Sequence, residues 1–383
     1  MDTIVLESKL ANTFKGKKVF VTGHTGFKGS WMMACLHVLG AKFKGYALAP
    51  EHKNGLYELL HPELGGESII DDVRNKKRLQ EEIVSFQPDF IFHLAAQPLV
   101  RRSYENPIET FETNVVGTAN LLEAVSLIKK KCTVVIITTD KVYENKEDGI
   151  LYKEEDTLGG YDPYSASKAC MELVVSSFHN SFFNIDNFSV HQKAIATARA
   201  GNVIGGGDWS KDRIIPDVVR ALDGKLEISV RNPRAIRPWQ HVLEPLSGYL
   251  MLAASLDKNP HSFSKSYNFG PIPNDHLTVE QIVKKAIEVW GEGSWKDTSD
   301  PSQPHEAVTL RLDIQKAEKE LNWKPRLSAS SAIELTMEWY KKSVQEKVSC
   351  TFKQVKDYFT AKASAIVCGA YMFEELELSL LLL

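Results

Sequence analysis

Three glycines, Gly23, Gly26 and Gly29, come directly after a short apolar run and constrain this chain more than any other feature of its sequence. The run that begins at Lys18 is β-branched and aromatic, and the segment after the glycines has apolar residues at helical spacing as far as Leu39. This pattern predicts a strand, a tight turn and a helix. Because glycine lets the backbone approach a ligand and a helix N-terminus attracts phosphate, the turn is typical of a dinucleotide site. A glycine-rich turn without a ligand fits these residues equally well.

Composition excludes several classes of protein. Of the 383 residues, 43% are hydrophobic and 25% are charged, and the net charge is -3, which is ordinary for a globular chain of one or two domains. There is no basic excess to indicate nucleic acid, and no apolar run of about eighteen residues to indicate a membrane span. The N-terminus has no secretory pattern, so we expect a cytoplasmic protein. The five cysteines are widely spaced, which favours structural thiols and no metal site.

Apolar runs alternate with helical patterns along the first half of the chain. We expect strands over 42–47, 68–70, 88–96, 133–138 and 194–200, and helices over 76–86, 107–129 and 164–181. This alternation predicts an α/β fold with a doubly wound parallel (Rossmann) sheet, whose ligands lie at the carboxyl ends of the strands. His93, inside the fourth strand, is predicted to be a packed core histidine.

The end of the second predicted strand lacks the acidic residue that usually binds the adenosine ribose. Leu48, Ala49 and Pro50 follow that strand, and no Arg or Lys stands there to meet a 2′-phosphate. We therefore expect a weak preference for NAD over NADP. Asp72, after the third strand, is a candidate to bind the adenine amino group, and it is equally plausible as the N-cap of the helix over 76–86.

Hydroxyls and opposite charges gather at 138–143, at the end of the fifth strand. Tyr164 and Lys168 follow on the predicted helix, four residues apart and therefore on one face. An ammonium can lower the pKa of a phenol and bind a cofactor ribose, and such a phenol can take a proton from an alcohol. This spacing is common on ordinary amphipathic helices. One site requires these features in the order in which they occur: the glycine turn, Ala95 and Ala96 at a strand end, the cluster at 138–143, and the Tyr-Lys pair. The order therefore favours a single site.

Four arginines, Arg213, Arg231, Arg234 and Arg237, fall close together in the second half of the chain. Guanidinium groups suit the pyrophosphate of a sugar nucleotide. About two of the four arginines are expected to be solvated surface residues instead. We select Arg213 and Arg237, because each adjoins an apolar or proline-rich segment. Trp239 either stacks on a ligand or packs in the core, and packing is favoured.

Longer motifs extend the pattern. The stretches 22–31, 95–101, 159–164, 199–209 and 236–242 closely resemble the CDP-glucose 4,6-dehydratases, a family of extended short-chain dehydrogenases/reductases. The resemblance runs from about Phe14 to about Tyr340, and its narrowest motifs are Thr-Asp-Lys at 139–141 and Gly-Gly-Gly-Asp-Trp at 205–209. It implies conversion of CDP-glucose to CDP-4-keto-6-deoxyglucose with NAD, an early step of deoxysugar biosynthesis, by a homodimer or a larger homo-oligomer.

The resemblance also implies roles for individual residues. Tyr164 would deprotonate the C4 hydroxyl of the sugar with the help of Lys168 and Thr139, Lys141 would take the C5 proton, and Asp140 would protonate the C6 hydroxyl. The residues implied for the cofactor are Gly23, Thr25, Gly26, Phe27, Lys28, Gly29, Asp72, Val73, Leu94, Ala95, Ala96, Gln97, Thr113, Thr138, Tyr164 and Lys168. Those implied for the substrate are Gln97, Asn202, Arg213 and Arg237.

Two alternatives accompany this interpretation. A nucleotide-sugar 4-epimerase needs the same Tyr-Lys pair without the elimination residues, and a dinucleotide-sensing protein needs the fold without turnover. A dTDP-sugar dehydratase would carry Glu where this chain has Lys141. We expect Asp140 and Lys141 to pair poorly, because adjacent strand residues point to opposite faces.

The expected division of the chain is a Rossmann domain over 14–200, to which 241–262 returns, and a substrate lobe over 201–240 and 263–345. Peripheral helices are predicted over 278–290 and 313–321, each introduced by a capping residue. The helices over 107–129 and 164–181 carry apolar residues on more than one face, which fits the dimer interface that the family implies. The tail over 346–383, rich in leucine at its end, has no assigned role.

Overall fold

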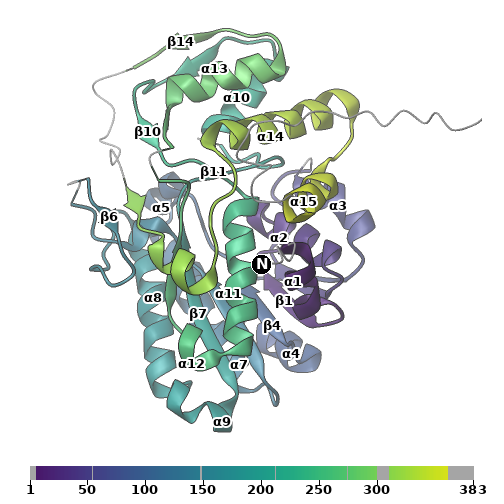
Figure 1. Ribbon diagram of the computed structural model, residues 1–383, viewed down its shortest axis with the longest axis vertical. Coiled ribbons are helices and arrows are strands. Elements are labelled where there is room, and N and C mark those ends of the chain that lie inside the picture. Colours follow the sequence, from purple (N-terminus) through teal and green to yellow (C-terminus); the bar gives the residue numbers. More distant parts are fainter. Residues whose placement is uncertain are drawn as a thin grey trace, which may run out of the picture.

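A seven-stranded parallel sheet forms the centre of the molecule, in a computed structural model that describes residues 6–53, 55–146, 149–211, 213–273, 275–299 and 310–360 (Figure 1). The order across the sheet is β12-β7-β5-β4-β1-β2-β3. The strands are β1 Lys18–Thr22, β2 Lys42–Ala47, β3 Glu67–Ile70, β4 Phe90–His93, β5 Cys132–Ile137, β7 Lys193–Ala200 and β12 Ser266–Phe269. The order reverses between β1 and β4, which confirms the doubly wound Rossmann fold and places the ligand crevice there.

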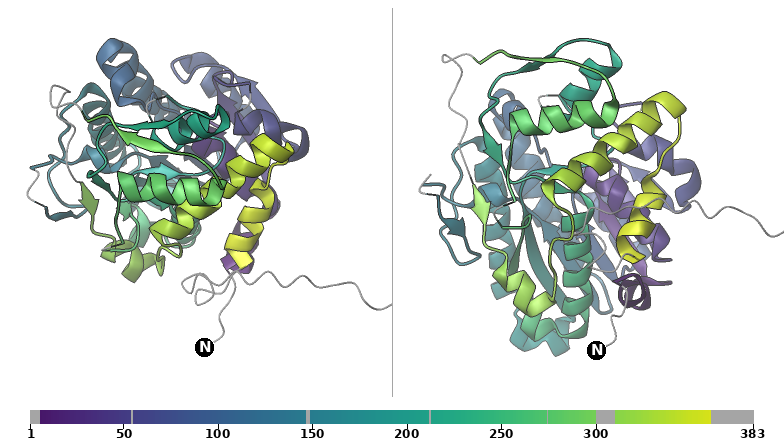
Figure 2. Two further views of the ribbon diagram at one scale, coloured as in Figure 1. Left: turned by 90° about the horizontal axis from the view of Figure 1, so that it is seen from above. Right: turned by 45° about the horizontal axis from the view of Figure 1, so that its top comes forward.

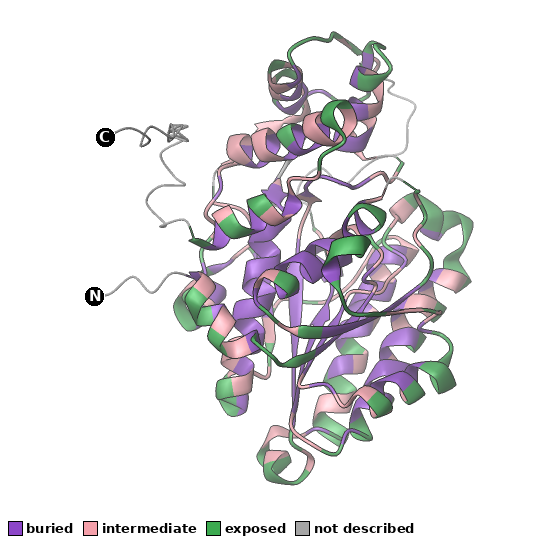
Figure 3. Ribbon diagram, turned by 90° about the vertical axis from the view of Figure 1, so that its right-hand side faces the viewer, coloured by how far each residue is buried: buried purple, intermediate pink, exposed green. Residues whose placement is uncertain are grey.

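Helices cover both faces of this sheet. One face carries α1 Leu6–Phe14, α2 Phe27–Val38 and α11 Leu243–Lys258, and the other carries α4 Lys76–Phe86, α7 Gly117–Ser126 and α8 Pro163–Ser181. Successive strand residues point to opposite faces, so Val19 and Val21 join the first core while Phe20 joins the second. Figure 3 shows the resulting buried strands at the centre of the molecule.

Most predicted elements are confirmed, with differences at their ends. β2 and α4 match their predicted ranges, whereas β4 is shorter than 88–96 and leaves Ala95 and Ala96 in the loop that follows. The helix predicted over 107–129 is α6 Pro107–Phe111, a wider π-helical turn η1 Glu112–Val116, and α7. His93 is confirmed as a core residue: its two ring nitrogens lie 2.7 and 3.1 Å from the hydroxyls of Thr22 and Thr118.

Smaller elements gather above the carboxyl ends of the strands, at the top of Figure 1, and Figure 2 shows them from two further sides. The helices there are α10 Ile214–Asp223, α13 Val279–Trp290, which Thr278 caps as predicted, and α14 Ala329–Lys341. Short strand pairs join β8 Val203–Ile204 to β11 Gln240–His241, β9 Ile228–Val230 to β14 Trp295–Asp297, and β10 Ile236–Arg237 to β13 Leu277–Thr278. The helix predicted over 313–321 ends in a π-helical turn, η4 Ala317–Leu321.

The remaining described elements are short connections. They are α3 Leu56–Leu64, α5 Val100–Glu105, η2 Asp140–Val142, β6 Leu151–Tyr152, η3 Ile185–Asn187, α9 Phe188–His191, α12 Pro260–Phe263, β15 Arg311–Leu312, η5 Lys342–Glu346 and α15 Thr351–Thr360. The predicted division into two domains stays a prediction. One boundary needs correction, since β12 falls in the range assigned to the lobe yet pairs with β7 in the main sheet.

The last described helix, α15, lies within the range predicted to be a tail without a role. Val355 and Phe359 are fully buried, and the Tyr358 hydroxyl donates to Glu244 Oε2 of α11 at 2.8 Å. This helix is therefore part of the folded core, while residues 361–383 lie outside the described residues. Over the part of the chain that the structure describes, no helix combines the length and apolarity needed to cross a membrane.

Candidate active site

The residues predicted for catalysis meet at the carboxyl edge of the sheet. Asp140 follows β5 and is 2% exposed; its Oδ1 lies 3.1 Å from Lys141 Nζ and accepts the Thr139 hydroxyl at 2.8 Å. The prediction that Asp140 and Lys141 pair poorly is wrong. They lie in the 3₁₀ turn η2 and not in a strand, so their side chains are not forced to opposite faces.

Tyr164 lies in the first turn of α8 and faces this pair. Burial raises the pKa of its phenol, whereas the charges of Lys141 and Arg213 and a hydrogen bond with Thr139 lower it. The sequence assigned that lowering to Lys168. In the structure Lys168 Nζ instead donates to the carbonyl of Ile137 at 3.1 Å, and Lys141 is the ammonium that acts most strongly on the phenol.

Lys28, Lys141 and Arg213 act on the charge of Tyr164 or Asp140, and Lys28 also acts on Lys168. Burial lowers the pKa of Lys168 to about 7 and that of Lys28, in the first turn of α2, to about 8. The charges of Arg213 and Lys141 lower the pKa of Lys28 further, and Asp140 opposes them. Cations that depress one another's pKa are stabilised when an anion enters, so this cluster suits phosphate groups.

The glycine turn is built for close backbone packing. Gly23 has φ +75°, and a Cβ there would lie 2.6 Å from the Ala95 nitrogen; a Cβ at Gly29 would lie 2.0 Å from Gly23 O. Gly26 is the N-cap of α2, and no side chain caps the helix there. The first N–H groups of α2 are thus left for an outside acceptor such as the pyrophosphate of a dinucleotide, which fits the predicted cofactor.

The other residues predicted for the cofactor fall into two groups. Several are half-buried and remain predictions: Phe27, Leu94, Ala95, Ala96 and Thr113, together with Thr25, whose hydroxyl donates to Leu48 O at 2.8 Å. Others have side chains committed elsewhere. Thr138 donates to Glu172 at 2.5 Å, Val73 is buried against Gly117, and the Gln97 amide bonds Leu99 O and Thr110 Oγ1 at 3.1 and 3.0 Å. The Gln97 side chain therefore shapes its own loop.

The Asp72 carboxylate binds Arg74, with Nη2 at 2.6 Å and Nε at 2.9 Å. The alternative that Asp72 caps α4 is wrong, because the cap is Asn75, whose side chain accepts from Arg78 N at 3.3 Å. Contact between Asp72 and an adenine remains a prediction.

Three of the residues predicted for the substrate, Asn202, Arg213 and Arg237, lie in the segment that follows β7. Gly201, next to Asn202, packs on Asp140, whose Oδ2 would be 3.1 Å from a Cβ there, and Arg213 Nη1 lies 2.6 Å from Asp208 Oδ2. The Arg237 side chain lies outside the described parts. Arg231 and Arg234 are exposed, as expected for surface arginines. Trp239 packs against the main core, which confirms the favoured interpretation.

Sequence reasoning missed the buried ion pair beneath the site. Glu172, one turn after Lys168, accepts Arg199 Nε at 3.0 Å and Nη2 at 2.9 Å, and Arg199 Nη1 bonds the Tyr143 hydroxyl at 2.8 Å. Both charged side chains are 3% exposed. The signal was present, since Glu172 continues the Tyr164 and Lys168 spacing by four more residues and Arg199 stands between two alanines near the end of β7.

A small pocket beside β10 was also missed. Its lining residues are Gly149, Ile236, Pro238, His276 and Arg311, and two of them flank Arg237 in sequence. Arg311 Nη2 donates to Gly149 O at 2.9 Å, while Arg311 Nε and His276 Nδ1 are buried without a partner among the described residues. Buried donors without partners suit a polar ligand in this pocket.

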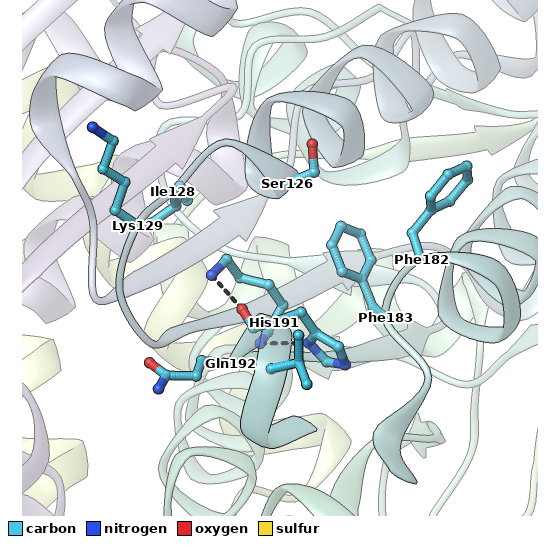
Figure 4. Close-up of a pocket in the computed structure, with 9 residues that line it drawn as sticks. Ser126, Ile128, Lys129, Phe182, Phe183, His191 and Gln192 are labelled. Carbon is cyan, nitrogen blue, oxygen red and sulfur yellow. Dashed lines mark hydrogen bonds between the residues drawn. The ribbon is translucent and has the colours of Figure 1, made fainter. Parts of the chain in front are cut away.

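Another pocket lies at the opposite edge of the sheet, where β5 and β7 begin (Figure 4). Phe182 and Phe183 of the α8 end line one side of it, and Lys129 lies on the other. Ligands of doubly wound sheets bind at the carboxyl ends of strands, so this pocket is not the candidate active site.

Comparison with known proteins agrees with this geometry. A family model described as GDP-mannose 4,6 dehydratase matches residues 20–336. The chain belongs to the GDP-mannose 4,6 dehydratase family. Within this family it is 47% identical over 352 residues to CDP-glucose 4,6-dehydratase of Salmonella typhimurium, which covers 91% of this chain and 98% of that protein.

More distant relatives of the dehydratase family share the fold. CDP-paratose 2-epimerase of Salmonella typhi is 25% identical, over 84% of this chain and 98% of its own length. The crystal structure of dTDP-glucose 4,6-dehydratase from Streptomyces venezuelae, with NAD and TYD bound, superimposes with a TM-score of 0.71 at 24% identity, over 85% of this chain and 97% of that one.

Proposed function

We infer that this chain catalyses the NAD-dependent 4,6-dehydration of CDP-glucose, giving CDP-4-keto-6-deoxyglucose and water. The observation that carries the inference is the placement of Asp140 and Lys141 as a contacting pair beside Tyr164, in a chain 47% identical to a CDP-glucose 4,6-dehydratase over 91% of its length. A 4-epimerase needs the phenol but has no use for an acid and a base at C5 and C6. The pair therefore favours elimination.

The proposed proton transfers follow from these positions. Tyr164 takes the proton of the C4 hydroxyl, and Lys141 and Arg213 stabilise the phenolate. The Lys141 ammonium then passes one proton to Asp140, whose Oδ1 lies 3.1 Å away. The neutral amine takes the C5 proton, which the 4-ketone acidifies, while Asp140 protonates the leaving C6 hydroxyl. Lys141 then returns its proton to C5. Tyr164 has then gained one proton and Lys141 has lost one, so transfer of one proton from Tyr164 to Lys141 restores the resting charges. The glycine turn, with Lys28 and Lys168, would hold NAD, which would supply the acceptor for the C4 hydride and the donor of that hydride to C6.

The residues proposed to hold NAD are the glycine turn, the uncapped start of α2, and Lys28 with Lys168. The cations of the cluster and the unpaired helix N–H groups suit the cofactor and substrate diphosphates, which are anionic. Because Leu48, Ala49 and Pro50 follow β2 directly, with no Arg or Lys among them, NAD should restore activity to the cofactor-free protein better than NADP. Equal restoration by NADP would contradict this specificity.

We propose a homodimer formed by α5, α6, η1 and α8. These elements pack together and expose large apolar side chains: Ile108 is 70%, Tyr104 59%, Leu173 58% and Val116 48% exposed. Such a contiguous apolar face suits a self-complementary interface. Sedimentation should give a dimer at micromolar concentration and a monomer for Ile108→Asp combined with Leu173→Asp, whereas a monomeric wild type would contradict the proposal.

The decisive experiment is an assay of purified protein with NAD and CDP-glucose, followed by mass analysis of the sugar. Loss of water with formation of a 4-keto-6-deoxy sugar supports the proposed function. A CDP-hexose of unchanged mass but inverted C4 would identify an epimerase, and binding of NAD without any turnover would identify a sensing protein.

A further inference from the structure

The loop over 205–211 and Arg213 supply a charged pair, Asp208 with Arg213, whose guanidinium acts on Tyr164 of the active site. Gly205 packs on Phe27, since a Cβ at Gly205 would lie 3.1 Å from the tip of that ring. Trp31 Nε1 donates to Gly206 O at 2.9 Å. Both aromatic residues belong to α2, whose N-cap is Gly26 and whose first turn carries Gly29. The loop therefore lies against the element that begins the cofactor site.

The Asp208 carboxylate of this loop binds the Arg213 guanidinium through a single nitrogen, Nη1. Arg213 Nη1 lies 2.6 Å from Asp208 Oδ2, and Asp208 Oδ1 accepts the Ser210 N–H at 3.0 Å. The carboxylate is 6% exposed and the arginine side chain 34% exposed. A guanidinium has five N–H donors in a fork, so binding one of them orients the others. The exposed side of Arg213 is thus left for an anion, and its charge already acts on the pKa of Lys28 and Tyr164.

A residue far along the chain fixes Asp208 in turn. The hydroxyl of Tyr340, at the end of α14, donates to the backbone carbonyl of Asp208. The Tyr340 ring is fully buried between Trp339 and Trp209, with ring centroids 5.3 Å apart on each side. Trp339 also fills the space over Gly206, where a Cβ would lie 1.9 Å from its ring. Gly206 and the Asp208 backbone therefore lie against these buried rings.

We propose that Asp208 is a positioning residue that aims the Arg213 guanidinium at the substrate diphosphate, and that Tyr340 holds Asp208 in place for this role. The proposal deepens the proposed function, because it rests on a nucleotide diphosphate as the ligand of Arg213. Asp208 does not touch the substrate in this arrangement. It fixes the direction of the donors that do.

The test measures the dissociation constant of CDP, which carries the diphosphate without the sugar. Asp208→Asn keeps size and the acceptor for Ser210 N–H but removes the charge that holds Arg213, so binding should weaken about tenfold. Tyr340→Phe should weaken it by a smaller factor, because only the hydroxyl is lost. In an Arg213→Ala background, adding Asp208→Asn should change binding less than about twofold, since its effect passes through Arg213.

Asp89→Asn is the matched control. It removes a carboxylate that pairs with Lys130 at 2.5 Å at the opposite edge of the sheet, and it should leave CDP binding unchanged. Equal weakening in Asp89→Asn and Asp208→Asn, wild-type binding by Asp208→Asn, or full additivity with Arg213→Ala would each overturn the proposal. If Asp208→Asn does not fold, Tyr340→Phe alone and combined with Arg213→Ala decides by the same additivity criterion.

Different measurements test the proposed function and the proposed role of Asp208. Turnover of CDP-glucose by the wild type tests the reaction, whereas the ratio of CDP dissociation constants tests Asp208 and does not depend on turnover. A wild-type protein that binds CDP but does not dehydrate CDP-glucose would contradict the reaction and leave the Asp208 result decisive. A wild-type protein that does not bind CDP would overturn both.

Discussion

Lys141 Nζ lies 3.1 Å from Asp140 Oδ1, so the groups proposed as base and acid of the elimination are in contact before any substrate binds. In the elimination step Lys141 gains a proton and Asp140 loses one, so that step leaves the two groups as a charged pair. The contact therefore stabilises the state in which the leaving water has formed. A substrate placed between the two groups has to compete with this contact.

Asp140→Asn tests the elimination. The amide keeps the size of the side chain but cannot release a proton, so removal of the C6 hydroxyl should slow by about a hundredfold or more while oxidation at C4 survives. The variant should bind CDP-glucose and stall with reduced NAD and the 4-keto-glucose, seen by rapid-mixing absorbance and mass analysis. Release of dehydrated product at the wild-type rate, or no reduction of NAD, would show that Asp140 is not the acid.

Tyr164→Phe tests the first step in the same assay. Without the phenol no group accepts the C4 proton, so no reduced NAD should form. The matched comparison is Tyr143→Phe, which removes a buried hydroxyl bonded to Arg199 beneath the site. That variant should lose stability but still reduce NAD. Reduction of NAD by Tyr164→Phe at a rate near that of the wild type would show that another group accepts the proton of the C4 hydroxyl.

Arg311→Ala tests the pocket beside β10. Arg311 Nε is buried without a partner among the described residues, and a polar ligand group would satisfy it. The KM for CDP-glucose should rise about tenfold with a smaller change in kcat, because the pocket lies away from the reacting atoms. Arg231→Ala, at an exposed arginine of the same region, is the comparison and should leave KM unchanged. An unaltered KM in Arg311→Ala would show that the pocket beside β10 does not take part in binding CDP-glucose.

Glu244→Gln tests the contact between α11 and α15. Burial raises the pKa of the Glu244 carboxyl from 4.5 to about 7, so the folded protein binds more protons than the unfolded chain between these values. Its contribution to stability is therefore complete below pH 4.5 and lost as pH rises through about 7. The free energy of unfolding of Glu244→Gln, relative to wild type, should rise by about 3 kcal/mol across that window. Denaturant titrations at several pH values measure it, and a constant difference would contradict the assignment.

Truncation separates α15 from the residues that follow it. A chain ending at residue 360 keeps every described contact of α15 and should retain stability and turnover. A chain ending at residue 350 loses the buried Val355 and Phe359 and the Tyr358 bond to Glu244, and it should be less stable by several kcal/mol. Thermal unfolding and turnover of both chains provide the check. Equal stability of the two would show that α15 is dispensable.

The sequence by itself determined the fold class and the order of the site. Strand and helix periodicity, the glycine turn and the spacing of Tyr164 and Lys168 depend on residues a few positions apart, so β2 and α4 could be predicted to the residue. The resemblance added Asp140 and Lys141, whose identities are set by the chemistry they are expected to perform.

The tertiary structure decided which of these groups meet. The Asp140–Lys141 contact depends on a 3₁₀ turn that no strand pattern predicts. The charge of Arg213 acts on Lys28 because the loop over 205–211 packs on α2. Glu172 with Arg199, and Tyr340 with Asp208 across 132 positions, are contacts between buried polar groups. Such partners are chosen by packing across the whole chain. Local sequence periodicity therefore cannot predict these buried polar partners.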